Sequence, residues 1–210
     1  MKRFLLAALM ASIILSIFTV SVFAEKGLIF PKSYKNAKGA YVDEDYGFSF
    51  VPPKKFELNN GPMYLLNEEA ENSLLSSFWY PIYEDDLNPS VSVFYSSVVP
   101  FDPETACKKE ILTAMQIALA QKFPSLKIHS KKMSCYDDGI KITLVYTGSK
   151  LFDEGLIRLK AATTLYLLPN GDAYEFEYAS LPSDFKKFLK QYYASEKTFS
   201  VEEVSFDEYG

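Results

Sequence analysis

Two cysteines and a single histidine are the residues of this chain best suited to covalent chemistry. Cys107 or Cys135 beside His129 could form a nucleophilic pair, because such partners need not be neighbours in sequence. This arrangement would make the protein a thiol-dependent hydrolase, and it requires a free thiol. His129 lies on a predicted strand beside Lys127 and Lys131. That setting favours a surface histidine without a catalytic role.

The two cysteines also allow a structural interpretation. An even number of cysteines in an exported chain favours a disulfide between Cys107 and Cys135, and two separate buried thiols are the alternative. Their spacing is too wide for a redox or zinc pair. The sequence has no Gly-x-Ser-x-Gly motif, no phosphate-binding glycine loop and no paired-histidine metal motif. We therefore expect a protein that is not an enzyme, with no catalytic residue, metal or cofactor.

Three acidic clusters could supply oxygen ligands to calcium. They are Asp43–Asp45, Glu84–Asp86 and Asp137–Asp138. None has the alternating ligand positions of a loop that wraps a calcium ion. Solvated turns are the interpretation that we favour for all three.

The first 24 residues predict export. A short basic start, Lys2-Arg3, precedes an uncharged apolar run, and Val22-Phe23-Ala24 suits cleavage after Ala24. We expect a signal peptide in residues 1–24 and a periplasmic or secreted protein. The alternative is an uncleaved membrane anchor, because the apolar run is nearly long enough to span a bilayer.

The remaining chain is predicted to be a single domain. Residues 25–40 form a flexible lead-in, residues 41–201 the domain and residues 202–210 an acidic tail. Cleavage would remove two basic residues and no acid, which changes the net charge from −5 to −7. A chain of that sign has no general attraction to nucleic acid.

A long hairpin and the helix after it organise the predicted fold. Residues 155–168 and 173–178 alternate with period two on either side of Asn170-Gly171, which indicates two antiparallel strands and a tight turn. This register would place Arg158 and Lys160 opposite Glu175 and Glu177.

Further elements precede and follow this hairpin. Short strands are expected at Phe48–Val51 and residues 74–80, and a longer one at Ser90–Val99. Asp102-Pro103 predicts the start of one helix that stops before Pro124. Strands at 126–136 and 140–147, a polar connection at 148–154 and a second helix starting at Ser183-Asp184 complete the order. We predict an α+β fold, an α/β/α sandwich with about six or seven mainly antiparallel strands and one helix on each face.

The most suggestive surface segment is a proline-bounded loop rich in aromatic and acidic residues. Aromatic side chains on loops often anchor partner proteins, and the alternative is that Phe78 and Trp79 close one edge of the core. The predicted partner-binding residues are Trp79, Tyr80, Tyr83, Glu84, Asp85 and Asp86.

The domain resembles the PsbP-like superfamily. The resemblance rests on Tyr46-Gly47-Phe48-Ser49-Phe50-Val51-Pro52, on the strands around Leu165–Phe176, and on the last helix followed by Thr198-Phe199. That architecture is shared by extrinsic lumenal subunits of photosystem II, a Ran-binding nuclear import factor and DcrB-type periplasmic proteins. The resemblance implies a non-enzymatic scaffold that attaches to larger assemblies, and it carries no functional residue over to this chain.

These observations lead to one main functional hypothesis and two alternatives. The main hypothesis is an exported, non-catalytic binding module that docks to an envelope protein or assembly. The alternatives are a periplasmic carrier of a small ligand or metal ion, with a pocket between the sheet and a helix, and the thiol-dependent hydrolase.

Overall fold

The fold is built on one large antiparallel sheet. The computed structural model describes residues 34–35, 39–58, 72–83, 87–152 and 155–201. Seven strands form the large sheet in the order β4-β5-β6-β10-β9-β8-β7, and every neighbouring pair is antiparallel. These strands are β4 (Glu57–Leu58), β5 (Asn72–Trp79), β6 (Ser90–Ser97), β7 (Lys127–Tyr136), β8 (Gly139–Phe152), β9 (Gly155–Leu167) and β10 (Asp172–Ser180). The predicted α+β sandwich with a mainly antiparallel sheet is confirmed.

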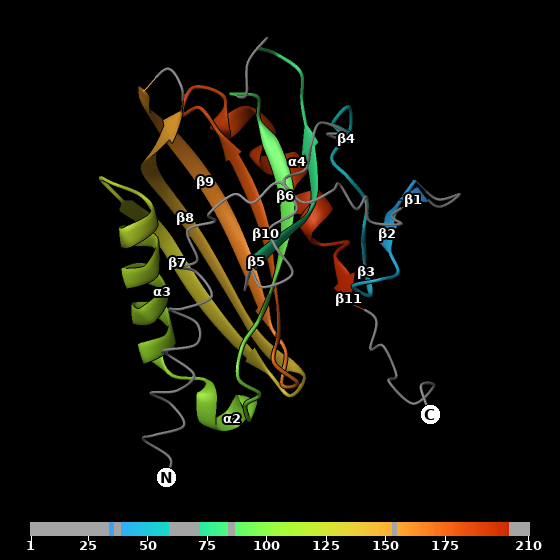
Figure 1. Ribbon diagram of the computed structural model, residues 1–210, viewed down its shortest axis with the longest axis vertical. Coiled ribbons are helices and arrows are strands. Elements are labelled where there is room, and N and C mark those ends of the chain that lie inside the picture. The colour runs from blue at the N-terminus through green and yellow to red at the C-terminus, as the bar shows by residue number, and fades with distance from the viewer. Residues whose placement is uncertain (1–33, 36–38, 59–71, 84–86, 153–154, 202–210) are drawn as a thin grey trace, which may run out of the picture.

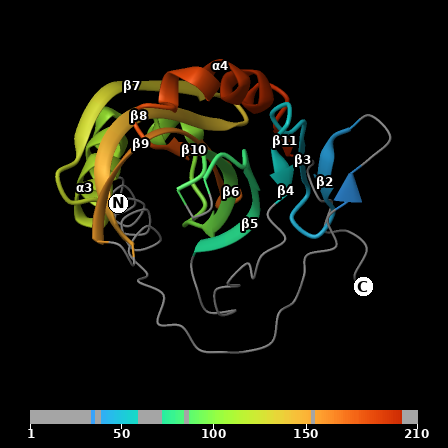
Figure 2. The same cartoon turned by 90° about the horizontal axis from the view of Figure 1, so that it is seen from above.

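Helices and a smaller sheet cover the two faces of the large sheet. Helix α3 lies on one face and α4 on the other, as Figures 1 and 2 show. The small sheet packs beside α4 and has the strand order β1-β2-β3-β11. The bounds are α2 (Pro103–Ala106), α3 (Lys109–Lys122), α4 (Phe185–Glu196), β1 (Tyr34–Lys35), β2 (Tyr41–Asp43), β3 (Phe48–Phe50) and β11 (Ser200–Val201).

Strand β10 contributes to both cores because its side chains alternate between the two faces. Tyr174, Phe176 and Tyr178 pack in the aromatic core under α4, whereas Ala173 packs in the aliphatic core under α3. Burial raises the pKa of Tyr178 to about 12, so its hydroxyl stays protonated and donates a hydrogen bond to the Phe185 carbonyl at 3.2 Å. The buried Tyr178 hydroxyl is therefore satisfied inside the aromatic core.

The β9–β10 hairpin forms where the sequence predicts it, but one expected set of contacts is wrong. Ala173 pairs with Leu167, and Glu177 pairs with Thr163. Glu177 hydrogen-bonds to Tyr146 on the α3 face, whereas Lys160 lies over the Phe185 ring of α4 on the opposite face. The predicted alignment of Arg158 and Lys160 with Glu175 and Glu177 fails because the two pairs project from different faces.

Gly171 is required by the turn of this hairpin. Its φ is +98°, and a Cβ atom there would lie 2.3 Å from the Val98 carbonyl oxygen. The Val98 amide donates to the Gly171 carbonyl at 2.7 Å. The turn thus contacts the end of β6 so closely that only glycine fits.

The first helix differs from the prediction because it is broken. The side chain of Asp102 accepts a hydrogen bond from the Glu104 amide at 3.3 Å and caps α2 as expected. The backbone then leaves helical geometry at Cys107, where ψ is 78°, and α3 starts at Lys109. Cys107 forms a disulfide with Cys135 near the end of β7, with Cα atoms 6.1 Å apart. The break therefore separates a disulfide-bonded turn from the helix that covers the sheet.

The expected polar connection at 148–154 is also wrong. Gly148 to Phe152 continue β8 and pair with β9, the last pair being Phe152 and Gly155. Polar residues in this stretch sit on a strand because the ladder to β9 satisfies their backbone groups.

The predicted signal peptide, most of the lead-in and the acidic tail lie outside the described residues. Among the residues that the structure describes, no helix is long and apolar enough to cross a membrane.

Candidate functional site

The predicted partner-binding loop begins with residues that are largely structural. Trp79 is the last residue of β5, pairs with Ser90 and is partly buried. Tyr80 packs between Phe56 and Phe188, with ring centroids 5.7 and 4.7 Å away. The alternative that Phe78 and Trp79 close an edge of the core describes Phe78, which is 4% exposed in the aromatic core, whereas Trp79 keeps partial exposure.

The next part of the loop is held by Asn88. Its Oδ1 atom accepts hydrogen bonds from the amides of Ile82 and Tyr83 at 2.7 and 2.8 Å, and its Nδ2 atom donates to the Tyr83 carbonyl at 3.0 Å. The Tyr83 hydroxyl donates to Asp184 Oδ2 at 2.6 Å, and Asp184 therefore anchors the loop to α4 instead of capping the helix. Pro81 and Ile82 stay exposed at the surface of this fixed turn. Glu84, Asp85 and Asp86 lie outside the described residues.

Replacing Asn88 with alanine is expected to loosen this loop and lower the free energy of unfolding by about 1–3 kcal/mol, because two amides lose their buried acceptor. Asn88→Asp keeps the acceptor oxygen and should lose less. Hydrogen exchange at the Ile82 and Tyr83 amides measures the effect. Equal protection of these amides in Asn88→Ala and the unaltered protein would contradict the assignment of Asn88 as the clamp.

A pocket of about 290 Å³ opens on the α3 face of the sheet. Its floor is a row of small residues on neighbouring strands, in which Ala179 pairs with Ser90 on one side and Ala161 on the other. Ala161 in turn pairs with Tyr146. Small side chains in one row leave a hollow between the larger residues, and Phe123 closes one side by packing directly on Gly148.

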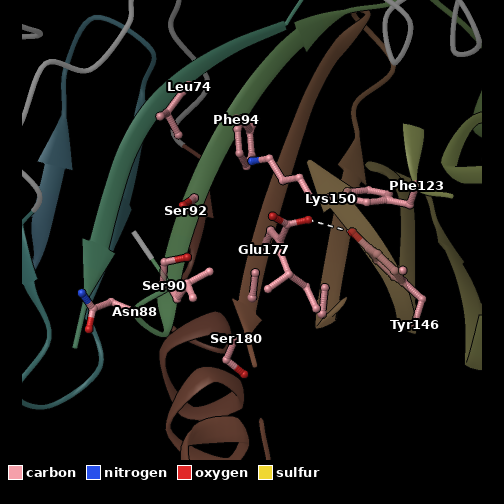
Figure 3. A pocket seen from close by; sticks show the side chains of 15 residues that line it. Leu74, Asn88, Ser90, Ser92, Phe94, Phe123, Tyr146, Lys150, Glu177 and Ser180 are labelled. Carbon is pink, nitrogen blue, oxygen red and sulfur yellow. Dashed lines mark hydrogen bonds between the residues drawn. The ribbon is translucent and has the colours of Figure 1, made fainter. Parts of the chain in front are cut away.

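Glu177 is the acidic group of this pocket (Figure 3). Its Oε2 atom accepts a hydrogen bond from the Tyr146 hydroxyl at 2.8 Å and a longer one from Thr163 at 3.5 Å. Burial and the nearby Glu177 carboxylate raise the pKa of Tyr146 well above its ordinary value, so the phenol remains a donor. The lining also contains the hydroxyls of Ser90 and Ser92. Lys150 lines the pocket as well, so the arrangement suits a small polar ligand whose hydrogen-bond donor group meets Glu177.

The two cysteines and His129 do not form the nucleophilic pair that a thiol-dependent hydrolase requires. Cys107 and Cys135 are both used by the disulfide, so the described residues contain no free thiol for a hydrolase. His129 is exposed on β7, and its Nε2 atom lies 2.6 Å from Thr147 Oγ1. Within the described part of the chain, no group of three histidine, cysteine or acidic residues could hold a metal ion.

Comparison with known proteins identifies the fold. No protein-family model matches the chain, and no curated protein matches it. The solution structure of cyanobacterial PsbP from Synechocystis sp. PCC 6803 matches with a TM-score of 0.52 and 13% identity, over 86% of this chain and 99% of that one. The predicted resemblance to the PsbP-like fold is thereby confirmed.

Two further solved structures are similar at lower scores. LpqN of Mycobacterium tuberculosis, described as involved in cell envelope biogenesis, has a TM-score of 0.49 and 10% identity over 73% of this chain and 82% of its own. The Ran-binding protein Mog1p of Saccharomyces cerevisiae has a TM-score of 0.43 and 11% identity, over 81% of this chain and 94% of its own.

Proposed function

We propose that this protein is an exported, non-catalytic binding module that docks to an envelope protein or assembly through the loop from Trp79 to Asp86. The observation that carries the proposal is the Asn88 clamp, which holds the backbone of Ile82 and Tyr83 in place while Ile82 remains 38% exposed. A loop fixed before binding loses little conformational entropy when a partner docks.

The chemistry of the loop supports a protein partner. Trp79 is partly buried and Pro81 is exposed, so an apolar surface is available next to the three acids that follow in the sequence. Apolar centres with a polar rim are typical of protein interfaces. The signal-like residues 1–24 support export.

Photocrosslinking tests this proposal. Ile82 is the position to replace with a photoreactive residue, because Tyr80 packs against Phe56 and Phe188 and a change there would disturb the core. The matched control is Ile117 on α3, which is 47% exposed and lies on the other side of the sheet. A recurrent protein crosslinked from Ile82 and absent from Ile117 is the expected result.

Substitution gives the second arm of the test. For this arm the photoreactive residue replaces Trp79. Ile82→Asp is expected to abolish the crosslinked complex, and Ile117→Asp should leave the complex intact. If the complex survives Ile82→Asp in a folded, exported protein, or if no partner is found from either loop position, the docking role of this loop is refuted.

A second candidate function is carriage of a small ligand in the pocket. The specific observation is Glu177, whose carboxylate is held by Tyr146 in a hollow lined by small residues. Thermal-shift titrations with a primary alkylamine, the matching alcohol and the matching carboxylate measure the preference. Stabilisation by the amine that disappears in Glu177→Gln supports a carrier, and equal responses to all three ligands refute a role for Glu177.

A further inference from the structure

Basic side chains gather on the α4 face of the sheet, across β7, β8 and β9. Lys127 on β7 pairs with Thr147 on β8, and Thr147 pairs with Lys160 on β9. Cross-strand partners project from the same face of a sheet, so Lys127 and Lys160 flank Thr147. Arg158 lies two residues before Lys160 and therefore shares its face.

His129 joins this group through its contact with Thr147. His129 Nε2 and Thr147 Oγ1 are 2.6 Å apart, so the imidazole lies beside the residue that Lys127 and Lys160 flank. Desolvation lowers the pKa of His129, and repulsion from Lys160, Lys127 and Arg158 lowers it further. Both the lowered pKa of His129 and the strand register indicate that His129 lies close to Lys127, Arg158 and Lys160. We call Lys127, His129, Arg158 and Lys160 the basic surface.

This surface contrasts with the charge of the whole chain, which is −5. The ion pair found within the described residues joins Lys141 to Glu196 and involves no member of the basic surface. Glu177 of the neighbouring strand β10 points to the opposite face, and Glu175, two residues away, shares that face. The basic surface therefore presents net positive charge to solvent, apart from the partial cover that the Phe185 ring gives to Lys160.

The basic surface borders one edge of the large sheet. Among the strands that the structure describes, the ten-residue β7 is last in the sheet order and pairs only with β8, with a bulge at His129. A strand in that position carries a row of backbone donors and acceptors that another strand can use. Lysines on edge strands often prevent unwanted pairing, but Arg158 and Lys160 lie two strands inside the edge, where no such protection is needed.

We propose that the outer edge of β7 and the basic surface bind an acidic, extended segment of a partner protein, which adds to the sheet as a further strand. Backbone hydrogen bonds to β7 would supply affinity, and alternate acidic side chains beside Lys127 and His129 would supply specificity. An anionic membrane is a poorer fit, because the net charge of the chain opposes approach to such a surface. This inference concerns a different part of the molecule from the Trp79–Asp86 loop.

Strand spacing gives the proposal a graded prediction. Strands lie about 4.8 Å apart, so an added strand would contact Lys127 directly and would lie about three strand spacings from Arg158. Lys127→Glu is expected to weaken binding about tenfold, and Arg158→Glu about two- to threefold, because interactions beyond about 10 Å are screened. Lys109→Glu, at the exposed start of α3, is the matched control and should have no effect.

The probe is a blocked ten-residue peptide of alternating glutamate and threonine, titrated into the full chain and followed by NMR. The expected result is a shift of β7 amides, together with protection from hydrogen exchange, and an affinity that falls as salt rises. Peptides with glutamine or lysine in place of glutamate should bind more weakly. A version with proline in place of threonine keeps the charge but removes backbone donors, and it should lose the protection.

Several outcomes would overturn the proposal. Equal binding of the proline peptide would show attraction without strand addition. Equal effects of Lys127→Glu and Lys109→Glu would remove the basic surface from the interaction. The protein could instead sediment with vesicles that contain phosphatidylglycerol, lose this binding in Lys127→Glu and bind no peptide. That result would assign the basic surface to a membrane.

Discussion

Replacing Phe176 with alanine is expected to lower the free energy of unfolding by about 3–5 kcal/mol, the range for a buried phenylalanine that leaves a cavity. Phe176 has no exposed surface. Its ring lies 5.0 Å from Phe50 of the small sheet, 5.7 Å from Tyr192 of α4 and 5.5 Å from Phe199. A cavity at this position would remove packing against the small sheet, α4 and Phe199 at once, so the surrounding structure can relax only partly.

Urea unfolding followed by the fluorescence of Trp79 measures this effect. A lower midpoint with an unchanged slope is expected, since the native compactness should be kept. Tyr136→Ala is the matched control, because Tyr136 lies on the same sheet but is 54% exposed, and its loss should change stability by less than about 0.5 kcal/mol. Similar losses in the two variants would contradict the central place of Phe176 in the core.

Removing the disulfide is expected to have the second-largest effect, about 3–4 kcal/mol. Cys107 and Cys135 are separated by 28 positions, and a cross-link of that span restricts the unfolded chain by this amount on the chain-entropy estimate. The loss should appear in the Cys107→Ser/Cys135→Ser double variant, measured by the same urea titration.

Reduction provides the control for this prediction. Dithiothreitol should lower the stability of the unaltered protein to that of the double variant, and it should leave the double variant unchanged. If the unaltered protein has the same stability with and without reductant, the bridge does not stabilise the fold. If the double variant responds to reductant, an effect other than the disulfide is being measured.

Much of the large sheet could be predicted from the sequence because its signals are local. The alternation in residues 155–168, followed by Asn170-Gly171, determines both strand direction and turn position. Phe185 and Phe188 at helical spacing likewise predict the buried side of α4, and both are buried. Patterns of this kind depend only on neighbouring residues, so no knowledge of tertiary contacts is needed.

Other features depend on contacts between distant residues, and the sequence does not reveal them. The helix break at Cys107 coincides with a disulfide to another strand. The continuation of β8 to Phe152 depends on its ladder with β9, since Ser149 and Lys150 are polar enough to suggest a loop. The sequence places Glu177 on a strand. Whether Glu177 shares a face with Arg158 depends on the strand register and on the helices that cover each face.

The candidate sites show the same division. The aromatic content of the Trp79–Asp86 loop is visible in the sequence, whereas the three hydrogen bonds by which Asn88 fixes Ile82 and Tyr83 are not. A motif search could not find the pocket, because its floor joins Ser90, Ala161 and Ala179 from three strands. The one local signal for the clamp is Asn88 directly before Pro89, because asparagine side chains often hydrogen-bond the backbone of a turn.

The position of β10 between β6 and β9 has a consequence for the order in which the chain can fold. β6 finds its inner neighbour only when Asp172–Ser180 has been synthesised, and β3 pairs with β11, which follows α4 near the C-terminus. Pairings between such distant segments form slowly, because a long loop must close before any contact forms. The strands made first therefore cannot complete their sheets until about the last fifth of the chain has been made. Such delayed closure would leave the early strands of a newly made chain without their sheet partners until β10 and β11 have been made.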